Sequence, residues 1–230
     1  MNLLPHIKLE TGNNPQHSII WLHGLGADGE DFVPIAEEMN LPVAVRYIFP
    51  HAPMRPVTIN GGFVMRAWYD ILAAAPTGGL DLESGRMQDE AGIRASQAEI
   101  EKLIAQEKQR GIAAQNIFLA GFSQGGAIVL HTGLRHAQQL GGLLALSTYL
   151  PLSGSLPQEA SSAMQHAPIF MAHGRSDPVI PYALGRASAQ QLIAGNYPLE
   201  WHEYAMPHSV CPEEVRDIEH WLAQRLASRA

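Results

Sequence analysis

Short apolar runs recur along the chain, separated by longer segments in which apolar residues follow the helical period. A short continuous apolar run is typical of a strand that is buried on both faces of a sheet. We predict such strands at residues 18–22, 43–49, 117–120, 142–146 and 169–172. Residues 199–204 alternate between apolar and polar side chains, which predicts a strand nearer the edge of the sheet.

Helices are predicted between these strands. In the longest, residues 87–110, the apolar residues Ile93, Ile100 and Leu103 lie mostly on one face, and Gly111 ends the helix. Shorter helices are predicted at residues 30–39, 127–135, 184–194 and 212–227, a weak one within 151–165, and a small hairpin at 57–65. Alternating strands and helices indicate an α/β fold with a mostly parallel central sheet and helices on both faces. No segment resembles a linker, so residues 1–230 are expected to form one domain.

Composition and charge narrow the choice of partners and compartment. The chain has 230 residues, 46% of them hydrophobic, which is enough for one sizeable core. A formal net charge of −7 argues against nucleic acid or an anionic membrane surface as the main partner. Cys211 is the only cysteine, which favours a reducing compartment. The first ten residues do not resemble a secretion signal and no apolar run could span a bilayer, so we expect a cytoplasmic protein without stable membrane insertion.

The apolar run at 117–120 leads directly into Gly121-Phe122-Ser123-Gln124-Gly125. Gly-x-Ser-x-Gly between a buried strand and a helix is the pattern of a nucleophile elbow, in which a tight turn exposes the serine hydroxyl. Glycine on each side of the serine relieves crowding where strand and helix approach each other. The pattern also fits a glycine-rich connector in an ordinary βα unit, so a nucleophile needs further support elsewhere in the chain.

A serine hydroxyl is a poor nucleophile at neutral pH unless a base accepts its proton and an acid orients that base. Asp177 follows the strand at 169–172 and His208 follows the strand at 199–204, so the chain order is Ser123, Asp177, His208. Other histidines lie within a strand, on or after helices, or before Asp177: His202, His131, His136, His220 and His173. Alone, Asp177 could cap a turn and His208 could be a solvated loop residue. Together with Ser123 they favour a catalytic triad.

Acyl transfer also needs hydrogen-bond donors for the oxyanion of the tetrahedral intermediate. The backbone N–H of Gln124, the residue after the nucleophile, is one predicted donor. The other is expected in the loop after the first buried strand, where we assign the N–H of Leu25. His23 is predicted to be a structural histidine below the site. Asp28 and Asp70 are predicted to be carboxylates of loops or hydrogen-bond networks.

Other chemistries fit the sequence less well. A Cys211–histidine pair lacks an orienting partner, and Cys211 precedes Pro212. Eleven histidines suggest metal binding, but neither His-Glu-x-x-His nor Cys-x-x-Cys occurs in the sequence. The glycines of residues 23–29 lack the spacing of a dinucleotide fingerprint, and this segment has no lysine to bind a phosphate. We therefore expect neither a cofactor nor a metal ion.

Taken together, these motifs resemble the carboxylesterase / acyl-protein thioesterase (phospholipase/carboxylesterase) family of α/β-hydrolases, most of all its bacterial carboxylesterases. The resemblance rests on residues 22–29, 68–70, 120–126, 145–147, 173–181 and His208, and extends from about residue 18 to the end of the chain. It implies the α/β-hydrolase fold and an apolar acyl pocket, which by position would be lined by Leu25, Ile71, Leu72 and Val179. Ordinary packing is the alternative for these four residues. In this family the segment around residues 70–82 covers the acyl site, and its composition here fits such a cover or a dimer contact.

The resemblance implies a serine carboxylesterase that cleaves short- to medium-chain carboxylic esters through an acyl-enzyme, on small-molecule or acyl ester substrates. An acyl-protein thioesterase or lysophospholipase acting on long acyl chains fits the same residues. The alternative from another class is a catalytically silent hydrolase-fold binding protein. A homodimer is compatible with the family. Pro207 stands where such relatives usually carry glycine before the histidine, which predicts a stiffer loop around His208.

Overall fold

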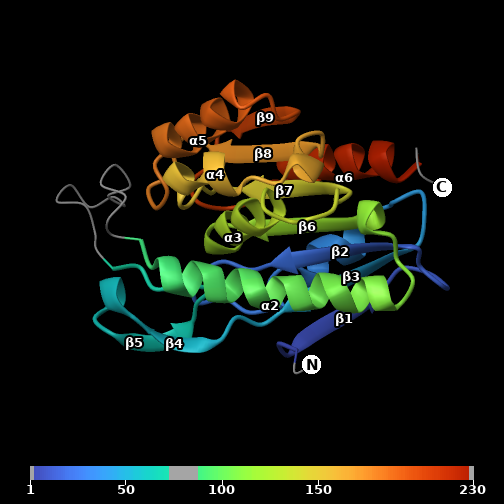
Figure 1. Ribbon diagram of the computed structural model, residues 1–230, viewed down its shortest axis with the longest axis horizontal. Coiled ribbons are helices and arrows are strands. Elements are labelled where there is room, and N and C mark those ends of the chain that lie inside the picture. Colours follow the sequence, from blue (N-terminus) through green and yellow to red (C-terminus); the bar gives the residue numbers. More distant parts are fainter. Residues whose placement is uncertain (1–2, 73–87, 228–230) are drawn as a thin grey trace.

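The computed structural model describes residues 3–72 and 88–227, in which a seven-stranded sheet runs through the centre (Figure 1). Its strands are β1 (His6–Glu10), β2 (His17–Leu22), β3 (Val45–Pro50), β6 (Ile117–Phe122), β7 (Gly142–Leu146), β8 (Ile169–Gly174) and β9 (Leu199–Tyr204). The strand order is β1-β3-β2-β6-β7-β8-β9, and every neighbouring pair is parallel except β1 with β3. The predicted α/β class is confirmed, and β9 lies at one edge as its alternating pattern indicated.

Helices cover both faces of this sheet, as predicted. The helices are α1 (Val33–Glu38), α2 (Glu90–Gln109), α3 (Gln124–Gly133), α4 (Leu156–Glu159), α5 (Tyr182–Ala194) and α6 (Pro212–Ala227). Successive strand residues point to opposite faces, so Ile20 packs in the core beneath α2, α3 and α5, whereas Ile19 and Trp21 pack in the core beneath α1 and α6. Figure 1 shows α2, α3 and α5 in front of the sheet. None of the helices in residues 3–72 and 88–227 has the length and apolar character needed to cross a membrane.

Several elements differ from the predicted ones, and two of the differences have a clear physical reason. Strand β1 was not predicted, because it is short, half-exposed and pairs antiparallel only with β3 at the sheet edge. Helix α1 begins at Val33 instead of near residue 30. The reason is local, since Asp28 Oδ1 accepts a hydrogen bond of 2.9 Å from the Glu30 N–H and holds a turn there.

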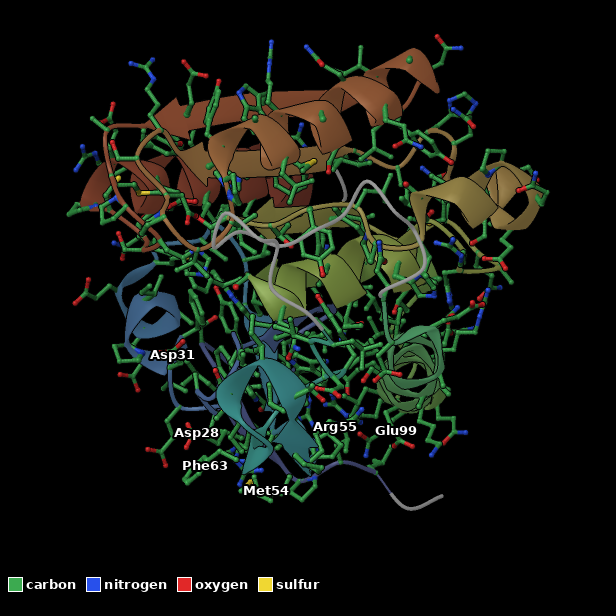
Figure 2. All side chains as sticks on the ribbon, turned by 90° about the vertical axis from the view of Figure 1, so that its left-hand side faces the viewer. Asp28, Asp31, Met54, Arg55, Phe63 and Glu99 are labelled. Atoms are coloured by element: carbon green, nitrogen blue, oxygen red, sulfur yellow. The ribbon has the colours of Figure 1, made fainter. Side chains whose placement is uncertain are left out.

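A separate hairpin lies beside the main sheet and contributes to one side of the site. Strands β4 (Met54–Val57) and β5 (Phe63–Arg66) pair antiparallel around the short helix Thr58–Asn60, as the predicted hairpin required. Asp70 fixes the turn by accepting hydrogen bonds from the Thr58 N–H (2.7 Å) and hydroxyl (2.5 Å). Figure 2 shows Met54 and Phe63 on this hairpin, where both side chains are exposed. Residues 73–87, most of the predicted covering segment, lie outside the described residues.

Candidate active site

Ser123 occupies the sharp turn between β6 and α3, as the Gly-x-Ser-x-Gly pattern predicted. Its backbone angles, φ 54° and ψ −119°, are unusual for a residue with a side chain and cost about 1–3 kcal/mol. Two hydrogen bonds hold the backbone in this conformation. The Ser123 N–H donates to the Leu146 carbonyl (2.8 Å), and the Thr148 hydroxyl donates to the Ser123 carbonyl (2.6 Å). The serine is therefore fixed by β7 and the loop that follows it.

The glycines on either side of Ser123 are required by close backbone contacts. A Cβ atom at Gly121 would lie 2.5 Å from the Gly125 carbonyl carbon, and one at Gly125 would lie 2.4 Å from the Leu22 carbonyl oxygen. Both separations are too short for non-bonded atoms, so any side chain would push α3 away from β6 and β2. The expected crowding at the elbow is thus present on both sides of the serine.

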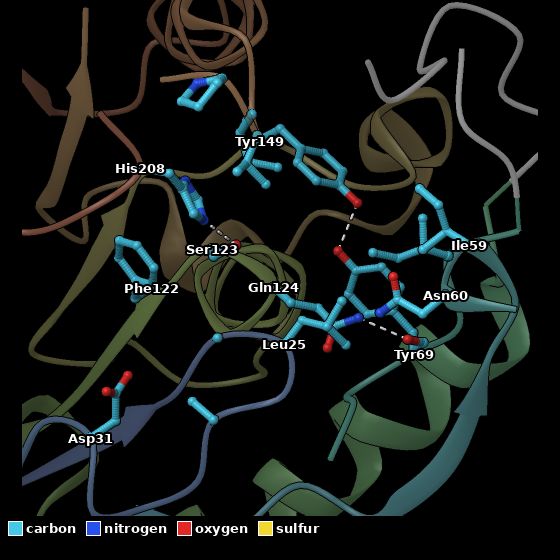
Figure 3. A pocket seen from close by; sticks show the side chains of 16 residues that line it. Leu25, Asp31, Ile59, Asn60, Tyr69, Phe122, Ser123, Gln124, Tyr149 and His208 are labelled. Atoms are coloured by element: carbon cyan, nitrogen blue, oxygen red, sulfur yellow. Dashed lines mark hydrogen bonds between the residues drawn. The ribbon is translucent and has the colours of Figure 1, made fainter. Parts of the chain in front are cut away.

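The structure brings Ser123, His208 and Asp177 together from loops after three parallel strands, β6, β9 and β8. Figure 3 shows the contact between Ser123 and His208. His208 Nε2 lies 2.9 Å from Ser123 Oγ, and His208 Nδ1 lies 2.7 Å from Asp177 Oδ2. The Asp177 side chain is fully buried, whereas the His208 side chain keeps 15% of its surface exposed. One ring nitrogen of His208 thus faces the serine and the other faces the carboxylate, as an orienting acid and a base require.

Asp177 is held as a carboxylate. Burial would raise the pKa of Asp177, but hydrogen bonds from His208 and from the N–H groups of Ile180 (2.9 Å) and Val179 (2.8 Å) hold it below its usual value. His173 lies behind it, with Nε2 2.9 Å from the Ile180 carbonyl oxygen and 3.5 Å from Asp177 Oδ2. Burial lowers the pKa of His173, so this histidine stays neutral. The acid therefore remains ionised at neutral pH.

The predicted oxyanion residues Leu25 and Gln124 line the same cavity as Ser123. Gln124 is the first residue of α3, and the first N–H groups of a helix have no partner within it. His23 fixes the other peptide, because its Nδ1 lies 2.7 Å from the Gly24 carbonyl oxygen. The Gly24 carbonyl and the Leu25 N–H belong to one trans peptide and point in opposite directions. The hydrogen bond from His23, together with a longer one from the Ala27 N–H (3.3 Å), therefore fixes the Gly24 carbonyl and with it the direction of the Leu25 N–H.

His23 can make this contact and a second one, from Ala52, only as the neutral ring with its proton on Nδ1. Its Nε2 accepts a hydrogen bond of 3.0 Å from the Ala52 N–H, so the proton of the neutral ring is assigned to Nδ1. Burial lowers the pKa of His23 to about 4, which keeps the ring neutral near pH 7. The prediction that His23 is a structural hydrogen-bonding residue agrees with these contacts.

The side chain of Gln124 makes contacts that sequence reasoning missed. Its Oε1 accepts a hydrogen bond from the Trp68 N–H and its Nε2 donates one to the Tyr69 carbonyl, each 2.7 Å long. The Trp68 indole N–H in turn donates to the His23 carbonyl (2.9 Å). The segment that follows the hairpin is thereby tied to both predicted oxyanion loops. Trp68-Tyr69-Asp70 is one of the motifs that carry the family resemblance, but the sequence does not indicate Gln124 as its partner.

A cavity of about 460 Å³ opens beside Ser123. Of the residues predicted to line an acyl pocket, Leu25, Ile71 and Val179 border this cavity, but Leu72 does not. Ile71 forms an antiparallel bridge with Gln88, and in an extended chain the next side chain points to the opposite side. Leu72 accordingly remains 41% exposed. The lining also includes residues that were not predicted: Ile59, Asn60, Tyr69, Phe122, Tyr149 and Asp31.

The geometry does not favour the alternative chemistries, a Cys211–histidine pair or a metal site. Both ring nitrogens of His208 are already within hydrogen-bond distance of Ser123 and Asp177, which leaves none for the partly buried Cys211. In the part of the chain that the structure describes, no group of three or more His, Cys, Asp or Glu side chains is arranged to hold a metal ion. The expected absence of a cofactor stays a prediction. The stiffening of the His208 loop by Pro207 also stays a prediction. This loop packs closely against Gly174, where a Cβ atom would lie 2.5 Å from the Pro207 carbonyl oxygen.

A serine on a strained turn after a central strand, with an aspartate and a histidine after later strands of a mostly parallel sheet, is the arrangement of an α/β-hydrolase. The chain belongs to the phospholipase/carboxylesterase family, whose profile matches residues 6–226. It is a hydrolase of that family, so the predicted family and fold are confirmed. The narrower placement among bacterial carboxylesterases stays a prediction.

Individual relatives cover nearly the whole chain. It is 35% identical to acyl-protein thioesterase 1 of Cryptococcus neoformans, across 97% of this chain and 98% of the relative. It is 40% identical to acyl-protein thioesterase 1 of Neurospora crassa, across 91% of this chain and 86% of the relative. Among solved structures it is similar to SOBER1 of Arabidopsis thaliana, with a TM-score of 0.81 and 30% identity over 91% of this chain and 99% of that one.

Proposed function

We propose that this protein is a serine carboxylesterase that hydrolyses short- to medium-chain carboxylic esters through an acyl-enzyme. Ser123 is the nucleophile, His208 the general base and Asp177 the residue that orients the base. The observation that carries the proposal is the unbroken hydrogen-bonded chain from Asp177 through His208 to Ser123, with links of 2.7 and 2.9 Å. A hydroxyl, an imidazole and a buried carboxylate in this order are the parts needed to activate a serine.

In the first half-reaction Ser123 Oγ attacks the ester carbonyl while His208 Nε2 takes the hydroxyl proton. The imidazolium that forms is stabilised by Asp177, whose lowered pKa keeps it ionised. The N–H groups of Leu25 and Gln124 donate to the oxyanion. His208 then gives its proton to the leaving alcohol oxygen, and the acyl group remains on Ser123.

In the second half-reaction a water molecule takes the place of the alcohol. His208 Nε2 accepts a proton from this water as it attacks the acyl-enzyme carbonyl, and the same N–H donors hold the second oxyanion. Collapse of the intermediate returns the proton to Ser123 Oγ and releases the carboxylic acid. Each residue therefore has the same role in both steps, and no cofactor is required.

The apolar part of the cavity supports the ester class. Ile71, Val179 and Ile59 line it with Leu25, and a hydrocarbon acyl chain would gain about 0.8 kcal/mol for each methylene that it buries there.

The second candidate is hydrolysis of acyl thioesters, which the names of the fungal relatives favour. Both substrates give the same acyl-serine, so they differ in the leaving group and in the length of chain that the cavity admits.

The decisive experiment is a chain-length series of p-nitrophenyl esters and matched acyl thioesters, measured with the wild type and with Ser123→Ala. We expect turnover of esters with a maximum at short to medium chains, and a loss of about 10⁵- to 10⁶-fold in kcat for Ser123→Ala. A fluorophosphonate probe should label Ser123 in the folded wild type. Equal turnover by Ser123→Ala would refute the assignment of the nucleophile, a maximum at long-chain thioesters would favour the second candidate, and an unlabelled, inactive wild type would indicate a binding protein.

We also propose a cytoplasmic location, which the single cysteine supports, and a small-molecule or acyl ester substrate with no nucleic-acid partner, which the net charge of −7 supports. The homodimer that the family suggests is a further proposal. Analytical ultracentrifugation over a range of protein concentrations tests it, and a single monomeric species throughout would reject it.

A further inference from the structure

Two phenol groups meet at the wall of the cavity, and the proposed reaction uses neither. Tyr69 comes from the segment after the hairpin and Tyr149 from the loop after β7, and both line the cavity. Their hydroxyl oxygens lie 2.6 Å apart, so one phenol donates its proton to the other. Both side chains are almost completely buried, at 3% and 4% exposed. This pair lies away from the Ser123–His208 contact, as Figure 3 shows.

Among the described residues, the hydrogen-bond count of this pair leaves one donor unused. Each phenol has a single O–H, and only one of the two hydrogens can lie between the oxygens. Within residues 3–72 and 88–227 neither oxygen has another hydrogen-bond partner. Burial raises the pKa of Tyr69 well above its usual value and that of Tyr149 to about 12, so both phenols keep their protons. As far as the described residues go, one O–H at the cavity wall has no acceptor throughout the neutral pH range.

The direction of the reaction places the acyl chain on the tyrosine side. The leaving oxygen of the ester must reach His208 Nε2 to receive its proton, and the oxyanion must reach Leu25 and Gln124. The remaining substituent of the tetrahedral carbon is the acyl chain, which is directed away from His208. Figure 3 shows His208 and the tyrosine hydroxyls on different sides of Ser123, with Ile59 and Asn60 beyond the hydroxyls.

We propose that Tyr69 and Tyr149 form a hydrogen-bond donor subsite for acyl chains that carry an acceptor oxygen, such as an ether or a ketone, a few atoms from the ester carbonyl. This inference rests on the proposed function, since it concerns the acyl part of the same ester. A plain hydrocarbon chain leaves the buried O–H without a partner, whereas an oxygen at the right position satisfies it. Ile71 and Ile180 line the same cavity and offer apolar surface to the rest of the chain.

The experiment compares p-nitrophenyl alkanoates with analogues of equal length in which an ether oxygen replaces the fourth, fifth or sixth chain atom. Each kcat/KM is divided by the rate of hydroxide-catalysed hydrolysis of the same ester, which removes differences in intrinsic reactivity. For the best position we expect the wild type to prefer the ether analogue about five- to tenfold. In the double variant Tyr69→Phe/Tyr149→Phe this ratio should fall to about one.

The variants are chosen to keep the fold. The double change removes both members of the pair and retains both rings, which is close to neutral for stability. The matched control is Tyr47→Phe, which removes a buried hydroxyl from the opposite face of the sheet and should retain the wild-type ratio. The wild-type comparison needs no variant, so it remains informative even if the double variant fails to fold.

Equal normalised rates for every pair of esters with the wild type would overturn the subsite, and would mean that the spare O–H binds only water. A preference retained in the double variant would overturn it as well. In either case Ser123-dependent hydrolysis of the plain alkanoates would leave the proposed function intact. Hydrolysis of neither kind of ester would refute the proposed function together with the subsite.

Discussion

The two sides of the cavity are held in place by different parts of the molecule. On one side, Ser123, Asp177 and His208 lie in the turn or loop after a strand of the seven-stranded sheet, and backbone hydrogen bonds fix both Ser123 and Asp177. On the other side, Ile59 lies in the turn of a two-stranded hairpin and Ile71 in the segment that follows it. Ile59 is 40% exposed, whereas Ser123 is buried. The sheet side is thus suited to fixed reaction geometry, and the hairpin side to variation in the substrate.

Hydrogen bonds join the two sides at a few defined points. The side chain of Gln124 bonds to the backbone of Trp68 and Tyr69, and the carboxylate of Asp70 fixes the hairpin turn at Thr58. The position of the hairpin side therefore depends on the same residue, Gln124, whose N–H is proposed as an oxyanion donor. If this comparison is right, changes on the sheet side should reduce kcat for every ester, whereas changes on the hairpin side should alter the choice among esters.

The largest effect is expected for Asp177→Asn. The amide oxygen can still accept from the Val179 and Ile180 N–H groups, but the amide nitrogen would donate to His208 Nδ1 and favour the wrong tautomer. We expect kcat/KM to fall about 10⁴-fold for short and long esters alike, the size of effect that the same change has in a serine protease with this triad. Steady-state kinetics with two chain lengths measures it.

The control for Asp177→Asn is Asp217→Asn. Asp217 lies on α6, where its carboxylate accepts a hydrogen bond of 2.7 Å from the Tyr204 hydroxyl. This variant should keep kcat/KM close to that of the wild type. A loss at Asp177 that is confined to one chain length, or no greater than the loss at Asp217, would contradict the assigned role.

The next effect concerns stability and pH on the sheet side. The unfolded chain takes up a proton at His23 near pH 6.5, whereas burial lowers the pKa of His23 in the folded state to about 4. The unfolded state therefore binds more protons between these values, so the free energy of unfolding decreases as the pH falls from about 6.5 to about 4. The contribution of His23 is about 3 kcal/mol at most. Above this range His23 adds no pH dependence.

Urea unfolding at several pH values, with the wild type and with His23→Asn, measures this contribution. Other buried histidines such as His131, whose pKa burial lowers to about 3, act in the same direction in both proteins and cancel in the comparison. The decrease in unfolding free energy at low pH should be smaller for His23→Asn. Identical pH dependence in the two proteins would show that His23 is not a buried neutral residue.

The same histidine should affect catalysis through the Leu25 peptide. His23→Leu removes the hydrogen bond to the Gly24 carbonyl, which frees the Leu25 N–H to turn away from the oxyanion. We expect kcat to fall about 10- to 100-fold with little change in KM, because the donor acts mainly in the transition state. His23→Asn should recover part of the loss, because its side-chain N–H can take the place of Nδ1–H. Equal losses in the two variants would point to a general packing defect.

The two sides also differ in how well the sequence predicts them. Gly121, Ser123 and Gly125 follow or end a short apolar run typical of a buried strand, and a parallel sheet brings the ends of its strands to one edge. This is why Asp177 and His208 could be identified from loops far apart in the sequence. The order of the strands and loops along the chain was sufficient to choose these two residues, because regular strands and helices leave few places where such loops can meet.

On the hairpin side no periodic sequence pattern specifies where a side chain points. Whether Ile71 or Leu72 faces the cavity depends on one bridge to Gln88, which the sequence does not reveal. The contact between Tyr69 and Tyr149 joins segments 80 residues apart and belongs to no motif. Contacts of this kind are set by the packing of irregular segments, so the sequence predicts a pocket without predicting its lining.

The smallest effect tests this last distinction, with Ile71→Ala and Leu72→Ala as a matched pair. Ile71 borders the cavity, so its truncation should lower kcat/KM for p-nitrophenyl hexanoate about tenfold and leave that for the acetate nearly unchanged. Leu72 is exposed outside the cavity, so Leu72→Ala should stay within about twofold of the wild type for both esters. A larger loss at Leu72 would restore the lining that the family resemblance implied. A uniform loss at Ile71 would mean that the hairpin side also sets the reaction geometry, and the two sides would then not be separable.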